Sequence, residues 1–260
     1  MTTPQLSDSD EKCFRLDFLG IGAQKAATTW LAYTLTDHPD IHVPKEKELH
    51  FWDLHYDRGI EAYKAFFQAS PTSPIRQGEF TPSYAILPKE RIQEAYDLSP
   101  KVRLIYSVRN PIARAWSAAL MAIQDAGMEF EEASDQWLID HFKSKGSRNR
   151  GHYRQCMENW LDVFPSEQCL VLCFEELPAN PKQALIDCCH HIDANPLDLD
   201  SLDPKRLTER VFAGPKHEIR PSLLPVLEGI YRTEMEQFPT YLDSVEKPEV
   251  AAQVRQHWSS

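Results

Sequence analysis

The sequence predicts an α/β fold in which a central parallel sheet carries helices on both faces. Short, densely apolar segments of strand length recur at residues 14–21, 102–108 and 169–174, and segments with helical periodicity separate them. Strands that alternate with helices pair in parallel, because each crossover returns the chain to the same end of the sheet. Ligands of such sheets gather at the carboxyl ends of the strands.

Local signals support each of these elements in turn. Residues 14–21 run into a glycine-containing turn, as expected of a buried strand, and residues 28–36 continue as a helix that stops before His38 and Pro39. Pro111 follows the second strand, in the first turn of the next helix, where proline is favoured. Further helices are predicted near residues 59–68, 88–96, 112–124, 131–143, 150–163, 181–191 and 221–236.

The chain of 260 residues is predicted to form one domain. No internal repeat, low-complexity linker or shift of composition marks a second one. We expect residues 13–245 to form this domain, residues 1–12 to be a disordered lead-in and residues 246–260 to be a loose tail.

Composition excludes several classes of partner. A net charge of -11 disfavours general attraction to nucleic acid or to an anionic membrane, although a local basic cleft remains compatible with it. No stretch approaches the roughly 20 apolar residues of a membrane helix, and residues 1–12 are polar. The six cysteines lack the C-x-x-C pairs and histidine companions of a zinc site, and we interpret them as reduced, mostly buried thiols in preference to a disulfide framework. We therefore expect a soluble, cytoplasmic protein with no bound metal, no nucleic-acid partner and no integral membrane contact.

The first motif with chemical content is the segment GIGAQKAATT at residues 20–29, which joins the first strand to a helix. Such a junction presents free backbone N–H groups and the positive end of a helix dipole, so it favours phosphate or sulfate. Lys25 adds a positive charge, and Thr28 and Thr29 add hydroxyl donors. An ordinary tight turn of small residues is the structural alternative.

The segment is not a Walker A motif, in which lysine directly precedes the serine or threonine. Here Lys25 precedes Thr28 by three positions. No obvious aspartate at a strand end is available to hold magnesium, which disfavours a phosphotransferase.

The second motif is the segment RLIYSVRNPIARAWS at residues 103–117. It places Arg109 just beyond a strand and Ser117 two turns into the following helix, where a guanidinium and a hydroxyl can converge on one phosphate. A surface salt bridge is the alternative role for Arg109.

Together the two motifs resemble the sulfotransferase family that uses 3′-phosphoadenosine 5′-phosphosulfate (PAPS), in particular its heparan sulfate and carbohydrate branch. The resemblance implies that Lys25, Thr28 and Thr29 bind the 5′-phosphosulfate and that Arg109 and Ser117 bind the 3′-phosphate. Arg114 matches a second arginine, which we interpret as structural. The cofactor-binding candidates are Lys25, Ala26, Ala27, Thr28, Thr29, Trp30, Arg109, Ser117, Tyr153, Phe212, Lys216 and His217.

Three further stretches extend the resemblance over roughly residues 14–190. They are KELHFWD at residues 47–53, GEFTPSY at residues 78–84, and GHY with NWL at residues 151–153 and 159–161. Several matches in the same order are far more specific than any one of them.

The sequence also departs from the family pattern. Ala27 stands where the loop has glycine, so the backbone must accept a Cβ there. Phe80 replaces a lysine on the acceptor side of the heparan enzymes, which disfavours a heparan-like acceptor. The segment 210–220, which contains Phe212, Lys216 and His217, matches the family's cofactor loop poorly.

The resemblance implies in-line transfer with Glu48 as the general base and Lys25 beside the leaving group. His50 competes with Glu48 as the base, since a neutral imidazole suits that task. Without the resemblance, Glu48 reads as part of a solvated charged run and His50 as structural. Glu79 either orients a cationic neighbour or forms an ordinary buried salt bridge.

The sequence therefore predicts an enzyme that moves a sulfuryl group from PAPS to a hydroxyl or amine, and releases 3′-phosphoadenosine 5′-phosphate (PAP). The acceptor is a carbohydrate, a lipid or a small molecule. A non-catalytic nucleotide-binding protein on the same fold is the alternative, and a P-loop phosphotransferase is a weaker one.

Overall fold

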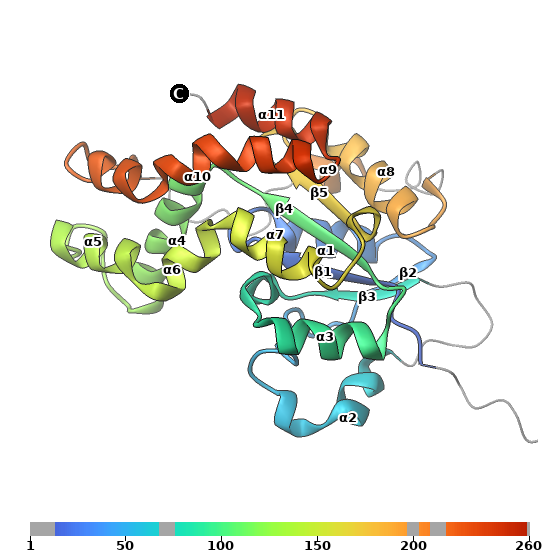
Figure 1. Cartoon of the computed structure of the whole chain (residues 1–260). Coiled ribbons are helices and arrows are strands. Elements are labelled where there is room, and N and C mark those ends of the chain that lie inside the picture. Colours follow the sequence, from blue (N-terminus) through green and yellow to red (C-terminus); the bar gives the residue numbers. More distant parts are fainter. Residues whose placement is uncertain (1–13, 68–75, 197–202, 209–216, 259–260) are drawn as a thin grey trace, which may run out of the picture.

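The sheet at the centre of the fold is parallel, as the sequence predicted (Figure 1). The computed structural model describes residues 14–67, 76–196, 203–208 and 217–258. Within these residues the sheet has five strands in the order β2-β3-β1-β4-β5. Their bounds are Phe18–Gly22 for β1, Ile41–His42 for β2, Arg76–Phe80 for β3, Arg103–Val108 for β4 and Cys169–Cys173 for β5.

Helices occupy most of the remaining described chain. Their bounds are Thr28–Thr36 (α1), Ile60–Lys64 (α2), Lys89–Leu98 (α3), Pro111–Asp125 (α4), Asp135–Lys143 (α5), Lys145–Gly151 (α6), Tyr153–Leu161 (α7), Pro181–His191 (α8), Pro204–Thr208 (α9), Leu224–Ser244 (α10) and Pro248–Trp258 (α11). Short 3₁₀ turns lie at Tyr56–Arg58, Ala65–Phe67, Pro82–Ile86, Ser166–Gln168 and Phe174–Glu176.

Alternation along the strands divides the core between the two faces of the sheet. Leu19 and Leu104 pack with α3, α7, α10 and α11 on one face. Phe18 and Ile105 pack with α1 and α8 on the other. Because both faces are covered, the strands read as continuous apolar runs, which is why the sequence revealed them.

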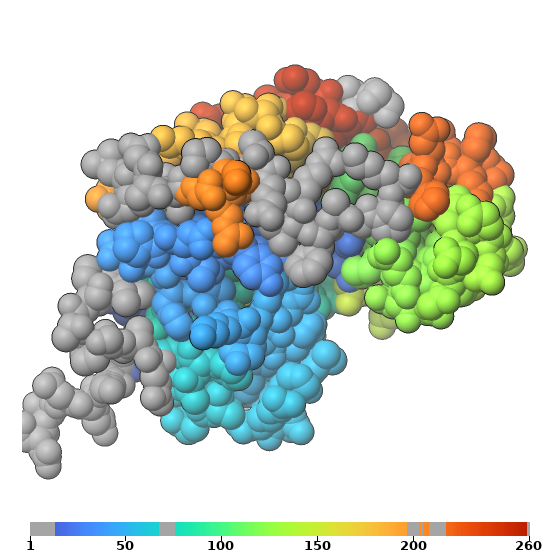
Figure 2. Space-filling view, turned by 180° about the vertical axis from the view of Figure 1, so that it is seen from behind, coloured from blue at the N-terminus to red at the C-terminus, as the bar shows by residue number. Residues whose placement is uncertain are grey.

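A third apolar cluster joins α4, α5 and α10 beside the sheet. In the view from behind, the lime surface of α5 and α6 forms a lobe next to the blue surface of the N-terminal residues (Figure 2). This cluster fixes α4, which carries Ser117, against the rest of the molecule.

The strand order determines where a ligand can bind. β1 lies between β3 and β4, with Gly20 opposite Phe80 and Gly22 opposite Tyr106. All these strands run in the same direction, so the segments after Gly22, Phe80 and Val108 emerge at one edge of the sheet.

Several segments differ from the sequence-based expectation, and the short elements β2 and α9 are among those not predicted. β3 was not predicted as a strand, because Gln77 and Glu79 interrupt its apolar pattern. The expected loose tail from residue 246 instead contains α11, whose Ala251, Val254 and Trp258 are buried. These three residues share one helical face, and polar neighbours obscure that pattern in the sequence. The expected lead-in of residues 1–12 lies outside the described residues.

Candidate active site

The loop between β1 and α1 forms the floor of the candidate site. The backbone N–H of Ala23 donates to the carbonyl of Ser107 on β4, at 2.7 Å. Lys25 and Ala27 both have left-handed backbone conformations, with φ of 69° and 63°. Ala27 precedes α1 and its side chain caps no N–H group, so the first turn of the helix keeps donors for an anion.

Lys25 extends from this loop toward α4. Its Nζ lies 3.7 Å from the Sδ of Met121, a weak acceptor, and the nearby carboxylates of Asp125 and Glu48 form no ion pair with it. Burial lowers the pKa of Lys25, and the nearby positive charge of Arg109 lowers it further. A group whose charge is this poorly stabilised is suited to an anionic ligand.

Arg109 follows β4 and contacts the same loop. Its Nη1 donates to the carbonyl of Lys25 at 3.0 Å, and its guanidinium lies 4.5 Å from the centre of the Phe174 ring. Burial lowers the pKa of Arg109 as well. Within the described segments, neither Lys25 nor Arg109 forms an ion pair with a carboxylate, so the surface salt bridge considered for Arg109 is not observed.

The other predicted cofactor-binding residues occupy different environments. Ser117 is half-buried on α4, two turns beyond Asn110, whose side chain caps that helix. Thr28 is buried and Thr29 half-buried in the first turn of α1. Trp30 is mostly buried, and its Nε1 donates to the carbonyl of Arg206 at 3.0 Å.

Tyr153 requires a correction as a direct cofactor contact. Its side chain is fully buried, and its hydroxyl donates to the carbonyl of Arg109 at 2.7 Å. Tyr153 therefore positions the backbone of Arg109. Ala26 is fully buried too, and its backbone N–H donates to the carbonyl of Ala23 at 3.2 Å.

Of the residues expected in the second cofactor segment, only His217 can be placed. Its ring stacks on Phe130 with centroids 3.9 Å apart, and its carbonyl accepts from Trp116 Nε1 at 2.6 Å. Phe212 and Lys216 lie outside the described residues.

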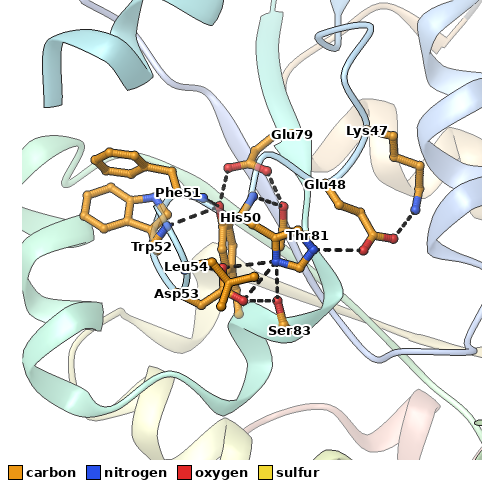
Figure 3. Close-up of polar contacts among 11 residues, drawn as sticks. Lys47, Glu48, His50, Phe51, Trp52, Asp53, Leu54, Glu79, Thr81 and Ser83 are labelled. Carbon is orange, nitrogen blue, oxygen red and sulfur yellow. Dashed lines mark hydrogen bonds and ion pairs between the residues drawn. The ribbon is translucent and has the colours of Figure 1, made fainter. Parts of the chain in front are cut away.

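Glu48 and His50 meet at the same edge of the sheet (Figure 3). Glu48 Oε1 pairs with Lys47 Nζ at 2.5 Å, and Glu48 Oε2 lies 3.4 Å from His50 Nε2. His50 Nδ1 is 3.0 Å from Asp53 Oδ2 and 3.3 Å from Ser83 Oγ. The imidazole is thus oriented between two carboxylates, and Glu48, with 36% of its side chain exposed, remains accessible to an acceptor.

Glu79 does not have the cationic partner that the sequence suggested. It is 1% exposed, and its carboxylate accepts hydrogen bonds from the hydroxyls of Tyr63, Thr81 and Tyr84. Burial raises the pKa of this carboxyl, against the opposing effect of these donors.

Sequence reasoning did not assign site roles to Lys47, Asp53, Thr81 and Ser83. Each of them lies in a motif that was recognised, but the contacts of Thr81 and Ser83 with the loop of Glu48 and His50 cross between two segments. Ser83 Oγ, for example, donates to Asp53 Oδ2 at 2.5 Å, over a separation of 30 residues. The spacing of His50 and Asp53 was the one local signal that could have identified Asp53.

These features define the class of protein: an α/β domain with an anion-binding strand–loop–helix, two cations beside it and a carboxylate at the same edge. The model of the family described as the sulfotransferase domain matches residues 15–204, and the chain belongs to this family.

Curated relatives include heparan sulfate sulfotransferases, the branch that the resemblance indicated. Heparan sulfate glucosamine 3-O-sulfotransferase 6 of Mus musculus is 31% identical over 164 residues, which are 62% of this chain and 47% of that protein. The 3-O-sulfotransferase 3B1 of Homo sapiens is 30% identical over 175 residues, with 62% and 42% covered. The chain thus spans about half the length of the curated relatives it matches.

Solved structures share the fold. A sulfotransferase from Alicyclobacillus acidocaldarius superimposes with a TM-score of 0.69 at 25% identity, over 87% of this chain and 95% of that one. Mouse sulfotransferase SULT7A1, solved in complex with PAP, gives a TM-score of 0.55 at 14% identity, with 93% and 88% covered. The second likeness concerns the fold alone.

The expected cytoplasmic location is wrong. A relative from Dictyostelium discoideum, the membrane-associated sulfotransferase kil1, is 31% identical over 110 residues, which are 42% of this chain and 23% of that protein. Net charge and a polar start describe only the residues of this chain, and they carry little information about its compartment. In the described segments, no helix combines the length and the apolar content that a membrane span requires.

Proposed function

We propose that this chain transfers a sulfuryl group from PAPS to a hydroxyl or amine of an acceptor. The observation that carries the proposal is the pair of half-buried cations, Lys25 and Arg109, linked through the carbonyl of Lys25 and left without carboxylate partners within the described residues. Cations in this state fit a ligand that brings several negative charges.

The residues around this pair match the two charged ends of the donor. Lys25 and the N–H groups at the start of α1 would hold the 5′-phosphosulfate, and Arg109 with Ser117 would hold the 3′-phosphate. PAP bound to the structurally similar mouse protein supports the choice of nucleotide. No metal is required for this scheme.

The proposed chemistry is an in-line displacement at sulfur. Glu48 accepts the proton of the acceptor as the new bond to sulfur forms, and the bond between sulfur and the bridging oxygen breaks to release PAP. Lys25 stabilises the charge that develops on that oxygen. His50, held by Asp53 and Ser83, orients Glu48.

For the acceptor, we propose a carbohydrate, a lipid or a small molecule that carries the hydroxyl or amine. The relatives named for heparan sulfate glucosamine support a sugar among these. Phe80 is 1% exposed and packs on Phe18, so its side chain offers no charge to an anionic glycan.

Calorimetry with PAP, adenosine 5′-phosphosulfate and ATP with magnesium tests the nucleotide site. We expect PAP to bind far more tightly than adenosine 5′-phosphosulfate, and Arg109→Ala to cost about 2–4 kcal/mol of PAP binding. Arg103→Ala is the matched control, because Arg103 lies at the opposite end of β4. Equal affinity for the two nucleotides, or tighter binding of ATP with magnesium, would overturn the assignment.

Turnover is tested by PAP release from PAPS in the presence of an acceptor panel of sugars, sterols, phenols and amines. Release that depends on one acceptor class supports the proposal. Tight PAP binding without release on any acceptor would indicate a non-catalytic nucleotide-binding protein.

A further inference from the structure

The loop that carries Glu48 and His50 has an unusual backbone. Both residues adopt left-handed conformations, with φ of 65° and 50°, which side-chain-bearing residues rarely occupy. Such conformations persist only where the surrounding structure imposes them. The structure must therefore contain groups that hold this loop.

These groups converge on one buried carboxylate. This carboxylate belongs to Glu79, near the end of β3. Its Oε2 accepts from the Thr81 hydroxyl at 2.6 Å, and its Oε1 accepts from the Tyr84 hydroxyl at 2.8 Å. Figure 3 shows Glu79 next to the loop residues, with a dashed line to Thr81.

The hydroxyls of Thr81 and Tyr84 also accept hydrogen bonds from backbone amides of the loop. The backbone N–H of His50 donates to Thr81 Oγ1 at 3.4 Å. Tyr84 Oη accepts from the backbone N–H of Phe51 at 2.9 Å and from that of Trp52 at 3.4 Å. The amides of the consecutive residues His50, Phe51 and Trp52 are thus each anchored through one hydroxyl to Glu79.

We propose that Glu79 is a positioning residue, which sets the conformation of the loop and thereby aims Glu48 and His50 at the acceptor. The inference rests on the proposed sulfuryl transfer. The charge is central to it: each oxygen of Glu79 receives at least one hydroxyl donor, so the hydroxyl lone pairs are left to face the loop amides.

The principal variant is Glu79→Gln, which retains shape but replaces one acceptor oxygen with a donor. The new NH₂ group points at the hydroxyl of Thr81 or of Tyr84, depending on which oxygen is replaced. That hydroxyl must then accept from the NH₂ group, which competes with the loop amide that it binds in the wild type. We expect kcat to fall by about 10- to 100-fold, the effect of a displacement near 1 Å at a reacting group. The affinity for PAP should change by less than about threefold, because Lys25 and Arg109 bind it from other loops.

A matched pair separates positioning from simple stability. Tyr63→Phe and Tyr84→Phe each remove a buried hydroxyl that donates to Glu79 Oε1, but only the Tyr84 hydroxyl contacts loop amides. We expect Tyr84→Phe to lower kcat at least about tenfold more than Tyr63→Phe at a temperature where both are folded. Equal kcat in the two variants, at similar losses of Tm, would show that the network is only structural.

Hydrogen exchange tests the same inference without turnover. In Glu79→Gln the amides of His50, Phe51 and Trp52 should exchange about tenfold faster, the scale of one weakened hydrogen bond, while amides of β4 keep their rates. Unchanged exchange of the loop amides would overturn the inference even if the enzyme is active. Faster exchange in a protein without sulfuryl transfer would instead refute the proposed function and leave the role of Glu79 in the loop intact.

Discussion

At the scale of single residues, Glu48 and His50 illustrate how similar candidates take different roles. The imidazole has a partner on each nitrogen, Asp53 on Nδ1 and Glu48 on Nε2. The Glu48 carboxylate is partly exposed and forms an ion pair with Lys47. The side chain of Lys47 is long and flexible, so the ion pair can open when an acceptor binds. The geometry favours Glu48 as the base and His50 as its support.

Replacing Glu48 by Gln should lower kcat by about 10²- to 10⁴-fold, because the proton acceptor is lost while the shape is retained. The affinity for PAP should stay close to that of the wild type. Steady-state kinetics and calorimetry measure the two quantities. If His50→Gln abolishes turnover in a folded protein and Glu48→Gln remains active, the two roles are reversed.

At the scale of elements, α1 begins at a residue that does not suit its backbone. Ala27 has φ of 63°, in the left-handed region that glycine occupies without strain. Alanine in place of glycine therefore adds backbone strain at this position. It does not block the first turn of α1, whose N–H groups stay uncapped by a side chain.

Ala27→Gly should raise the free energy of unfolding by roughly 0.5–1 kcal/mol, because relief of the strained conformation exceeds the added flexibility of the unfolded chain. Ala26→Gly, at the adjacent buried position with an ordinary backbone, should lower it by about 1 kcal/mol. Urea unfolding of both variants provides the measurement. A lower stability for Ala27→Gly would mean that its Cβ contributes more by packing than it costs in strain.

The C-terminal helix α11 is a second element whose role is structural. Trp258 is 3% exposed, stacks on Phe238 and donates from Nε1 to Glu175 Oε2 at 3.2 Å. Glu175 Oε1 in turn accepts from the backbone N–H of Asn110, next to Arg109. The helix thus braces the segment after β4 that carries Arg109.

Trp258→Ala should lower the free energy of unfolding by about 3–5 kcal/mol, the usual cost of removing a buried tryptophan. Arg255→Ala on the exposed side of α11 removes only an ion pair with Asp243 and should change it by less than about 0.5 kcal/mol. Thermal and urea unfolding distinguish the two. Small effects of equal size in both variants would mean that residues 246–260 form a loose tail, as the sequence suggested.

At the scale of the whole molecule, two half-buried groups on different helices give opposite dependences of stability on pH. Burial raises the pKa of Glu234 on α10 to about 7 and lowers the pKa of His191 on α8 to about 4. The raised pKa of Glu234 contributes stability at low pH that is lost as the pH rises toward 7. The lowered pKa of His191 contributes stability above its unfolded value of 6.5 that is lost as the pH falls toward 4. The two effects oppose each other in the same pH range.

Glu234→Gln removes the titrating carboxyl, so the pH dependence due to His191 should become visible. The amide oxygen of the glutamine can still accept from the backbone N–H of Arg154, which preserves the local structure. Relative to the wild type, its free energy of unfolding should increase between pH 4.5 and 7, by at most about 3 kcal/mol. His191→Gln should show the opposite slope. Urea unfolding at several pH values measures both, and parallel profiles for Glu234→Gln and the wild type would contradict the assigned pKa of Glu234.

Local pattern by itself determined the parallel α/β class, the strands with continuous apolar runs and the loop that opens α1. These features depend on residues close together in the sequence, so periodicity and turn chemistry report them. The family resemblance also selected Lys25, Glu48 and Arg109, which the fold brings to one edge of the sheet.

Only the tertiary structure decided how these residues are held. Tyr153 and Glu79 looked like ligand or salt-bridge residues, yet the first supports Arg109 and the second anchors the Glu48 loop through hydroxyls. The burial of α11 likewise depends on a surface supplied by α10 and β5. Contacts across many residues leave no periodic trace in the chain, because hydrogen bonds and packing depend on where the backbone returns in space.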